Sequence, residues 1–179
     1  GRTTLTELLR GRERIEGELQ LLIDQRSNPW GVTVSSVEMR DVVIPGALQD
    51  EYGMPAYFAE LKRCVDLYLA QHPILQSIGR YGLTESPAIQ HYRPGGGFKM
   101  PHFERSALAN STRMLVWMTY LNDVTDGGGT HFTYQQHTFD SRRGRTLIWP
   151  PDFTHTHAGV VSPTQHKYII TGWLNFVPA

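Results

Sequence analysis

His102 and Glu104, in the second half of the chain, have the residue types and the spacing of metal ligands. They flank Phe103, and residues two apart on a strand point to the same side, so the imidazole and the carboxylate can converge on one ion. One more histidine would complete a two-histidine, one-carboxylate facial triad, which leaves three positions of an octahedral Fe(II) open. A structural zinc site would instead close the metal off and would more often use cysteine. Because a lone His-x-Glu more often reflects ordinary packing, it needs support from the rest of the sequence.

That support comes from the segment that follows residue 149. His155 and His157 enter an expected strand two residues apart, so either can supply the third ligand. Further on, Lys167 leads the apolar run 168–174, where a buried ammonium is costly unless its charge is matched. An anionic cosubstrate with a distal carboxylate would match it; alternatively, the side chain reaches solvent. His131 and His137 follow an expected turn, and we interpret both as rim or packing residues.

The order and spacing of these motifs give the chain a family resemblance from about Tyr52 to Phe176. This region resembles the prolyl 4-hydroxylase-type branch of the Fe(II)/2-oxoglutarate dioxygenases. The motifs that carry the resemblance are 90–99 (QHYRPGGGFK), 102–104 (HFE), 118–123 (MTYLND), 127–132 (GGGTHF), 144–150 (GRTLIWP) and 157–159 (HAG), with Lys167 ten residues beyond His157. The acid between the histidines is glutamate here, whereas aspartate is commoner in the family.

The resemblance implies a set of site residues. The metal ligands would be His102, Glu104 and His157, with His157 favoured over His155 by the Ala-Gly that follows it and by its spacing to Lys167. Lys167 would hold the far carboxylate of 2-oxoglutarate. Tyr92 and Tyr120 fall where the family often places tyrosines around the cosubstrate, or they only pack. Thr171 and Trp173 would face the same pocket or its wall.

The resemblance also implies an activity and cofactors. We expect Fe(II)- and 2-oxoglutarate-dependent hydroxylation of an unactivated C–H, with release of succinate and CO2 and with ascorbate as a further cofactor. The substrate, whether peptidyl proline, a free amino acid or another small molecule, stays open. The alternatives are a cupin-like metal- or ligand-binding module without turnover and a stomatin-like scaffold fragment.

The elements that must position these residues are mainly β. Short β-rich runs are expected near 88–93, 98–103, 112–121, 130–134, 136–139, 145–149, 156–161 and 166–176. A helix is expected over 55–71, where Phe58, Leu61, Val65 and Tyr68 form one apolar face. Many short strands separated by turn residues indicate a sandwich or barrel, and the resemblance specifies a double-stranded β-helix, or jelly roll, for residues 51–179.

The hydrophobic pattern of residues 1–50 differs from that of the β-rich region. Leucines and isoleucines at helical spacing predict an amphipathic helix over 5–25, and alternation over 32–44 predicts a strand. The motifs 12–15 (RERI), 28–32 (NPWGV) and 37–42 (VEMRDV) make this segment similar to the end of a stomatin/prohibitin domain. We therefore expect a small α+β extension before the jelly roll.

Composition limits the partners. The chain has 17 basic and 17 acidic residues, so we expect no nucleic acid as partner and instead a small-molecule or peptide substrate. Cys64, the single cysteine, suits a reducing compartment, and no stretch is apolar enough for a membrane span. These features predict a cytoplasmic protein; the oligomeric state stays open.

Overall fold

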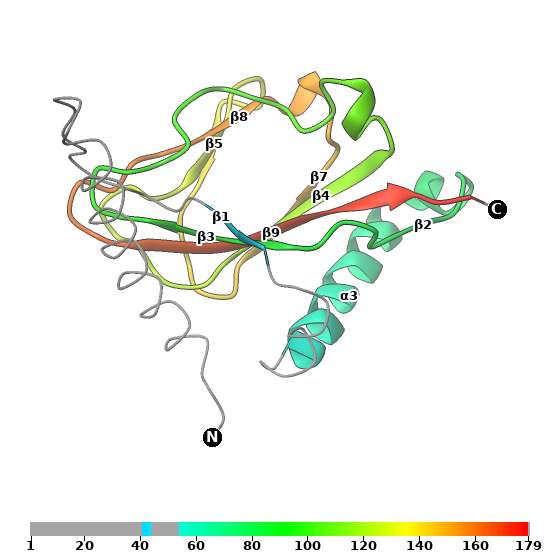
Figure 1. Ribbon diagram of the computed structural model, residues 1–179, viewed down its shortest axis with the longest axis horizontal. Coiled ribbons are helices and arrows are strands. Elements are labelled where there is room, and N and C mark those ends of the chain that lie inside the picture. Colours follow the sequence, from blue (N-terminus) through cyan, green and yellow to red (C-terminus); the bar gives the residue numbers. More distant parts are fainter. Residues whose placement is uncertain (1–40, 44–53, 179) are drawn as a thin grey trace, which may run out of the picture.

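The computed structural model describes residues 41–43 and 54–178. Its helices, 3-10 turns and strands, labelled as in Figure 1, are β1 (Asp41–Val43), α3 (Met54–Gln71), η2 (Pro73–Gln76), β2 (Tyr81–Gly82), β3 (Ala88–Tyr92), η3 (Leu108–Asn110), β4 (Arg113–Tyr120), β5 (Thr130–Phe132), β6 (His137–Phe139), β7 (Thr146–Trp149), η4 (Phe153–His155), β8 (His157–Gly159) and β9 (Lys167–Phe176). Within these ranges, no helix is both long and apolar enough to cross a bilayer.

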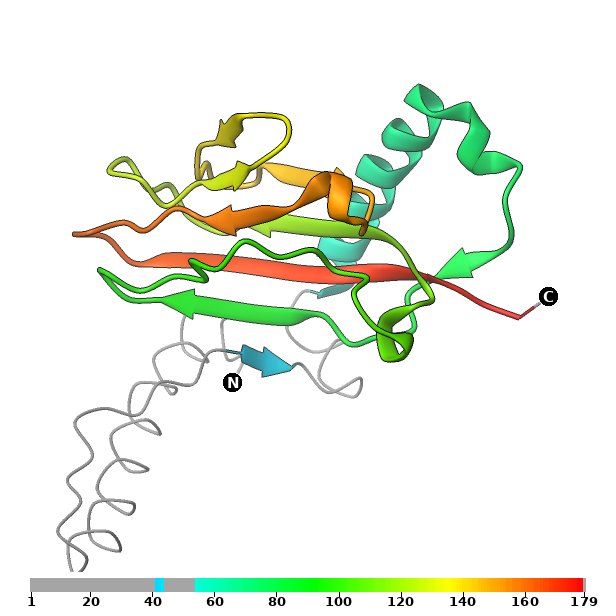
Figure 2. The same ribbon diagram turned by 90° about the horizontal axis from the view of Figure 1, so that it is seen from above.

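Two antiparallel sheets form the framework of the domain (Figures 1 and 2). The larger sheet has the order β1-β3-β9-β4-β7, with β2 paired to the far end of β9, and the smaller sheet has the order β6-β5-β8. Apart from the pair β5 and β6, neighbouring strands of these sheets are distant in sequence, as in a jelly roll. The predicted jelly-roll fold with flanking helices is confirmed.

Strand β4 lies between β9 and β7 and is buried on both faces. Because successive side chains alternate, Leu115 and Trp117 pack on the α3 side, while Val116, Met118 and Tyr120 pack toward the smaller sheet. A strand covered on both faces contains a nearly continuous apolar run, which is how MLVWM at 114–118 appears in the sequence. The domain therefore has two core clusters, one on each side of the larger sheet.

Helix α3 covers the outer face of the larger sheet at one end (Figure 2). Its apolar face, spaced three to four residues apart, brings Leu61 into the core and packs Tyr57, Val65 and Tyr68 against it. The Tyr57 hydroxyl also makes a 2.9 Å hydrogen bond with Thr119 of β4. The helix expected over 55–71 is confirmed.

Gly172 of β9 lets the two longest strands approach closely. It lies opposite Trp117, and a Cβ at this position would come within 2.4 Å of the indole ring. Glycine is therefore required for the Trp117 ring to pack against β9 at this position.

The predicted strand over 98–103 is wrong. Within it, only His102 forms a β-bridge, with His157, while the amide of Gly159 donates to Phe98 O over 2.8 Å. The chain thus advances four positions from Phe98 to His102 while β8 advances only two from His157 to Gly159, so the chain bulges at Met100-Pro101. Pro101 has no N–H to continue the ladder, and Met100 projects into solvent.

The predictions for the N-terminal extension fall largely outside the described residues. The helix expected over 5–25 lies entirely there, as does most of the strand expected over 32–44. Of that strand, Asp41–Val43 form β1, which pairs with β3 antiparallel from Asp41 opposite Gln90 to Val43 opposite Ala88. A strand from the N-terminal fifty residues therefore extends the larger sheet.

Candidate metal centre

Two chain segments bring His102, Glu104 and His157 together. His102 and His157 exchange backbone hydrogen bonds of 3.0 and 2.9 Å, which places their imidazoles side by side with ring centroids 4.3 Å apart. The amide of Glu104 donates to Pro151 O over 2.9 Å and so fixes the next turn of the chain. Glu104 Oε1 then lies 3.4 Å from His102 Nε2 and 3.5 Å from His157 Nε2.

The hydrogen bonds of the two imidazoles determine which nitrogen faces the centre. His102 Nδ1 is 3.0 Å from Met100 O, and His157 Nδ1 is 2.9 Å from His155 O. A carbonyl oxygen only accepts, so each Nδ1 carries a proton and Nε2 is the ring nitrogen that faces Glu104 Oε1.

The donor set fits Fe(II). Three ligand atoms, two imidazole nitrogens and one carboxylate oxygen, lie within 4.8 Å of one another and are the one such group among the described residues. Two neutral nitrogens and one anionic oxygen on one side of a cavity match the facial triad of a non-haem iron site.

Electrostatics at Glu104 favour a positive charge between the ligands. Burial opposes ionisation of the carboxyl group, but contacts with His102 and His157 outweigh it and hold the pKa of Glu104 well below its ordinary value. For His102, burial lowers the pKa, while the contact with Glu104 and the Met100 carbonyl raise it, and the net shift is upward. A proton or a metal ion between these groups would be stabilised in the same way.

The second oxygen of Glu104 is held by two residues outside the ligand set. Arg113 Nη1 donates to Oε2 over 3.2 Å, and Trp173 Nε1 donates to the same atom over 3.1 Å. Sequence reasoning placed Trp173 at the pocket but missed Arg113. The one sequence feature that could have indicated Arg113 is its position at the start of an otherwise apolar strand.

A cavity of about 210 Å³ opens beside the three ligands. Its lining residues come from both sheets and from the 98–104 segment: Gln90, Tyr92, Phe98, His102, Glu104, Met118, Thr130, Trp149, His157, Gly159, Lys167, Ile169, Thr171 and Trp173. Most of the predicted site residues therefore line one cavity. Thr130, which the sequence did not single out, joins them.

Lys167 is the cationic group of this cavity. It is 4% exposed, and its Nζ lies 5.1 Å from the centre of the Tyr92 ring. Burial alone lowers the pKa of Lys167 to about 8, and no carboxylate among the described residues pairs with it. At neutral pH the ammonium is still largely protonated, so the cavity holds a positive charge that an anionic ligand would match.

The two predicted tyrosines differ in position. Tyr92 lines the cavity and donates its hydroxyl to Gln90 Oε1 over 2.7 Å. Tyr120 is fully buried outside the lining, and its hydroxyl makes a 2.7 Å hydrogen bond with Thr130 Oγ1. The same hydroxyl lies 3.2 Å from Phe139 O, so Tyr120 contacts both the cavity-lining Thr130 and strand β6. A direct role for Tyr120 in cosubstrate binding stays a prediction, and the geometry offers an indirect one.

The remaining histidines lie away from the three ligands. His155 is in the 3-10 turn η4, with its Nδ1 3.1 Å from Thr154 Oγ1, and it lines a separate surface hollow. His131 Nδ1 bonds Thr138 across the smaller sheet, and His137 is exposed. None of the three lines the cavity. Thr171 lines it, while its hydroxyl donates to Trp117 O over 3.0 Å.

Comparison with known proteins places this site in a family. Residues 87–175 match the model of the 2OG-Fe(II) oxygenase superfamily, and they span β3 to β9 with every residue of the three-ligand centre. The chain therefore carries an oxygenase domain of the 2OG-Fe(II) oxygenase superfamily.

Solved structures with a similar fold include prolyl hydroxylases. The viral collagen prolyl hydroxylase of Paramecium bursaria Chlorella virus-1, in its 2OG complex, superposes with a TM-score of 0.57 at 20% identity, covering 78% of this chain and 81% of that chain. A Pseudomonas putida prolyl-4-hydroxylase gives a TM-score of 0.57 at 17% identity, with coverage of 88% and 84%. At these identities the likeness shows the fold.

Curated relatives match the N-terminal part of the chain instead. A stomatin homologue of Pyrococcus horikoshii is 37% identical over 71 residues, which is 40% of this chain and 26% of that protein. Stomatin-1 of Caenorhabditis elegans is 41% identical over 49 residues, or 15% of its length. The chain thus spans about a quarter or less of these relatives, and the resemblance of the N-terminal segment to stomatins is confirmed.

Proposed function

We propose that this protein is a 2-oxoglutarate-dependent hydroxylase that converts an unactivated C–H to C–OH and releases succinate and CO2. The observation that carries the proposal is that one cavity of about 210 Å³ holds both the three-ligand centre and the buried ammonium of Lys167. A metal-binding module without turnover has no need of that ammonium, whereas a cosubstrate with two carboxylates uses both features.

Different residues of the cavity would bind the metal ion and the cosubstrate. Fe(II) would be held by His102 Nε2, Glu104 Oε1 and His157 Nε2, and the distal carboxylate of 2-oxoglutarate would be held by Lys167. When bound, Fe(II) supplies the reduction of dioxygen coupled to loss of CO2, with one oxygen atom entering the substrate C–H and the other entering succinate.

Aromatic side chains pack against the two histidine ligands. Phe98 packs edge-on against the His102 ring at 4.3 Å, and Trp149 packs edge-on against the His157 ring at 5.0 Å. These contacts fix the ring planes and cover one side of each imidazole.

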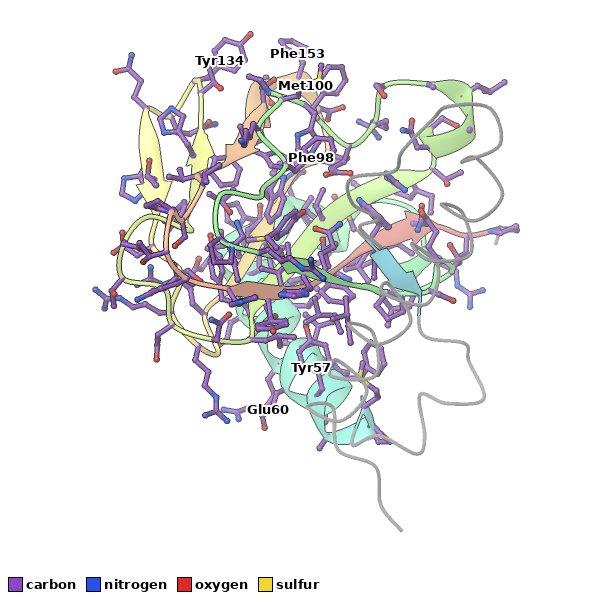
Figure 3. The ribbon with its side chains drawn as sticks, turned by 60° about the vertical axis from the view of Figure 1, so that its left-hand side comes forward. Tyr57, Glu60, Phe98, Met100, Tyr134 and Phe153 are labelled. Carbon is purple, nitrogen blue, oxygen red and sulfur yellow. The ribbon has the colours of Figure 1, made fainter. Side chains whose placement is uncertain are left out.

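An exposed apolar surface next to the metal ligands supports a peptide substrate. Phe98, Met100, Tyr134 and Phe153 are large exposed apolar side chains on the side of the molecule away from Tyr57 and Glu60 of α3 (Figure 3). Met100 is 74% exposed, and its carbonyl accepts from His102 Nδ1, so the apolar surface begins at the metal ligands. Together with the prolyl hydroxylase-like fold, this surface supports a peptidyl C–H, such as that of a prolyl residue, as the target.

Anaerobic titration with Fe(II) and then 2-oxoglutarate tests the proposal. Wild type should develop the weak visible charge-transfer band of a chelated 2-oxo acid, and Glu104→Ala and His157→Ala should each abolish it. His137→Ala, an exposed histidine outside the cavity, is the matched control and should keep the band. Absence of both the band and iron affinity in wild type would overturn the proposal.

Succinate release then identifies the substrate. Prolyl peptides, free proline and other free amino acids are compared under air with Fe(II), 2-oxoglutarate and ascorbate. Peptide-dependent succinate with a matching gain of one oxygen atom in the peptide is the expected result. Turnover on free amino acids alone would contradict the peptide assignment and leave the oxygenase assignment standing. Omission of ascorbate shows whether it sustains turnover.

A further inference from the structure

Glu104 is the acidic ligand, and its two carboxylate oxygens face different partners. Oε1 faces the two imidazole nitrogens at 3.4 and 3.5 Å, while Oε2 accepts from Arg113 Nη1 at 3.2 Å and from Trp173 Nε1 at 3.1 Å. With two donors on Oε2, the carboxylate cannot turn to offer both oxygens to the same ion without losing hydrogen bonds to charged and buried groups.

Arg113 is itself fixed from several directions. Its Nη1 also donates to the carbonyl oxygen of Glu104 over 3.0 Å, and its guanidinium lies 3.5 Å from the centre of the Trp173 ring. On its other side, Glu85 accepts from Nε at 3.1 Å and from Nη2 at 2.7 Å. The side chain is largely buried and forms a rigid planar fork between two carboxylates.

We propose that Arg113 and Trp173 are positioning residues that restrict Glu104 to a one-oxygen metal ligand. This inference rests on the proposed metal site. A carboxylate bound through one oxygen leaves three positions open on an octahedral ion, and 2-oxoglutarate chelation needs two of them. A glutamate that bound through both oxygens would remove one of the three.

Glu104 depends on this restraint because glutamate has one more rotatable bond than aspartate. The extra methylene gives the carboxylate a wider range of positions, and the Arg113–Trp173 pair selects one of them. Glu85 completes the arrangement by sharing the charge of Arg113, so that Glu104 keeps electron density for the metal.

A pair of tryptophan substitutions tests the role of Trp173. Trp173→Phe removes the N–H to Glu104, whereas Trp117→Phe removes a buried indole N–H that has no hydrogen-bond partner. The probe is Co(II), titrated without turnover and followed by its visible d–d absorption. The Co(II) dissociation constant should rise about tenfold in Trp173→Phe and stay within about twofold of wild type in Trp117→Phe.

A pair of arginine substitutions tests Arg113. Arg113→Met should weaken Co(II) about 10- to 100-fold. It should also change the d–d spectrum, as the freed carboxylate binds through both oxygens, and weaken 2-oxoglutarate on the Co(II)-loaded protein. The control is Arg105→Met, because Arg105 pairs with Asp152 through Nε and Nη2 and donates from Nη1 to the backbone carbonyl of Arg113, but none of these hydrogen bonds reaches the Glu104 carboxylate. Thermal unfolding checks that each variant folds.

The outcomes separate this inference from the proposed function. If wild type binds neither Co(II) nor Fe(II), the metal site itself fails. If wild type binds Co(II) and both Trp173→Phe and Arg113→Met match it in affinity and d–d spectrum, the positioning role is wrong while the metal site stands. Equal losses in Trp117→Phe or Arg105→Met would also overturn it, because the effect would then come from general loosening of the fold.

Discussion

The charged groups at the two ends of the cavity differ in whether the described residues pair with them. At one end, Glu104 is surrounded by Arg113, Trp173 and two imidazoles, and each carboxylate oxygen has at least two partners. At the other end, Lys167 is more deeply buried than Glu104 but faces an aromatic ring and no described carboxylate. Both charges are buried, yet only one is matched within the described part of the chain.

The difference separates a preorganised end from an end that is unsatisfied without a ligand. The Glu104 end has its hydrogen bonds in place before metal arrives, so little rearrangement is needed on binding. The Lys167 end carries a desolvation cost that an anionic ligand removes. The cavity is therefore built to take a cation at one end and an anion at the other, as 2-oxoglutarate on Fe(II) requires.

The largest expected effect comes from removing the unmatched charge. Lys167→Met should weaken 2-oxoglutarate by about 100-fold or more, because the distal carboxylate would then be buried without a partner. The same change should raise the free energy of unfolding of the ligand-free protein by about 1–3 kcal/mol, since no ammonium is buried. Isothermal titration and urea unfolding measure the two effects. Equal 2-oxoglutarate affinity in the variant would show that Lys167 does not hold the cosubstrate.

At the Glu104 end, shortening the side chain by one methylene should weaken metal binding and leave Lys167 unaffected. Glu104→Asp should weaken Fe(II) by about 10- to 100-fold, because the shorter side chain cannot reach both the metal and the donors on Oε2. The pKa of Lys167 should not move, since its one cause is burial. Anaerobic Fe(II) titration makes the measurement. If Fe(II) affinity is kept, the distance between Glu104 and its partners is not what tunes the site.

The pKa of Lys167 gives the two ends different pH dependences. With that pKa at about 8, raising the pH from 7 to 9 should weaken 2-oxoglutarate about tenfold as the ammonium loses its proton. Over the same range the ligand-free protein should become more stable, because between about 8 and the unfolded value near 10.5 the unfolded chain binds the extra proton. Lys167→Arg stays charged and should show a flat binding profile. A sloping profile in that variant would assign the dependence to another group.

The smallest expected effect comes from narrowing the cavity at Gly159. A Cβ there would lie 3.2 Å from Phe98 O and 3.5 Å from Lys167 Nζ. Gly159→Ala should therefore weaken 2-oxoglutarate by no more than about fivefold and leave Fe(II) affinity unchanged. A loss confined to Fe(II) would place this glycine's role at the metal end of the cavity.

The candidate site could largely be predicted because its signals are local in sequence. His102 and Glu104 lie two residues apart, and Lys167 begins an apolar run, so residue type and spacing alone indicate them. The spacing of strands and turns likewise indicated a sandwich or barrel, and the family resemblance then specified the jelly roll. Each of these features is determined by residues that lie close together in the sequence.

The rest depends on contacts between distant segments. The contact of Arg113 with Glu104 arises where β4 and β9 shift register between Arg113 and Leu115, which no local pattern records. His155 and His157 look equivalent by alternation, but the 3-10 turn Phe153–His155 directs the first away from the ligands. The strand expected over 98–103 failed because Pro101 cannot continue a ladder.

The isolated bridge between His102 and His157 has a consequence for folding. One pair of backbone hydrogen bonds joins the two ligand segments there, across roughly fifty residues of chain. A metal ion held by both segments would act as a reversible cross-link that closes this long loop. Since the unfolded chain does not assemble the ligand set, metal at 100 times its dissociation constant would add about 2.7 kcal/mol to the free energy of unfolding. Iron supply would then set the lifetime of the folded domain as well as its activity.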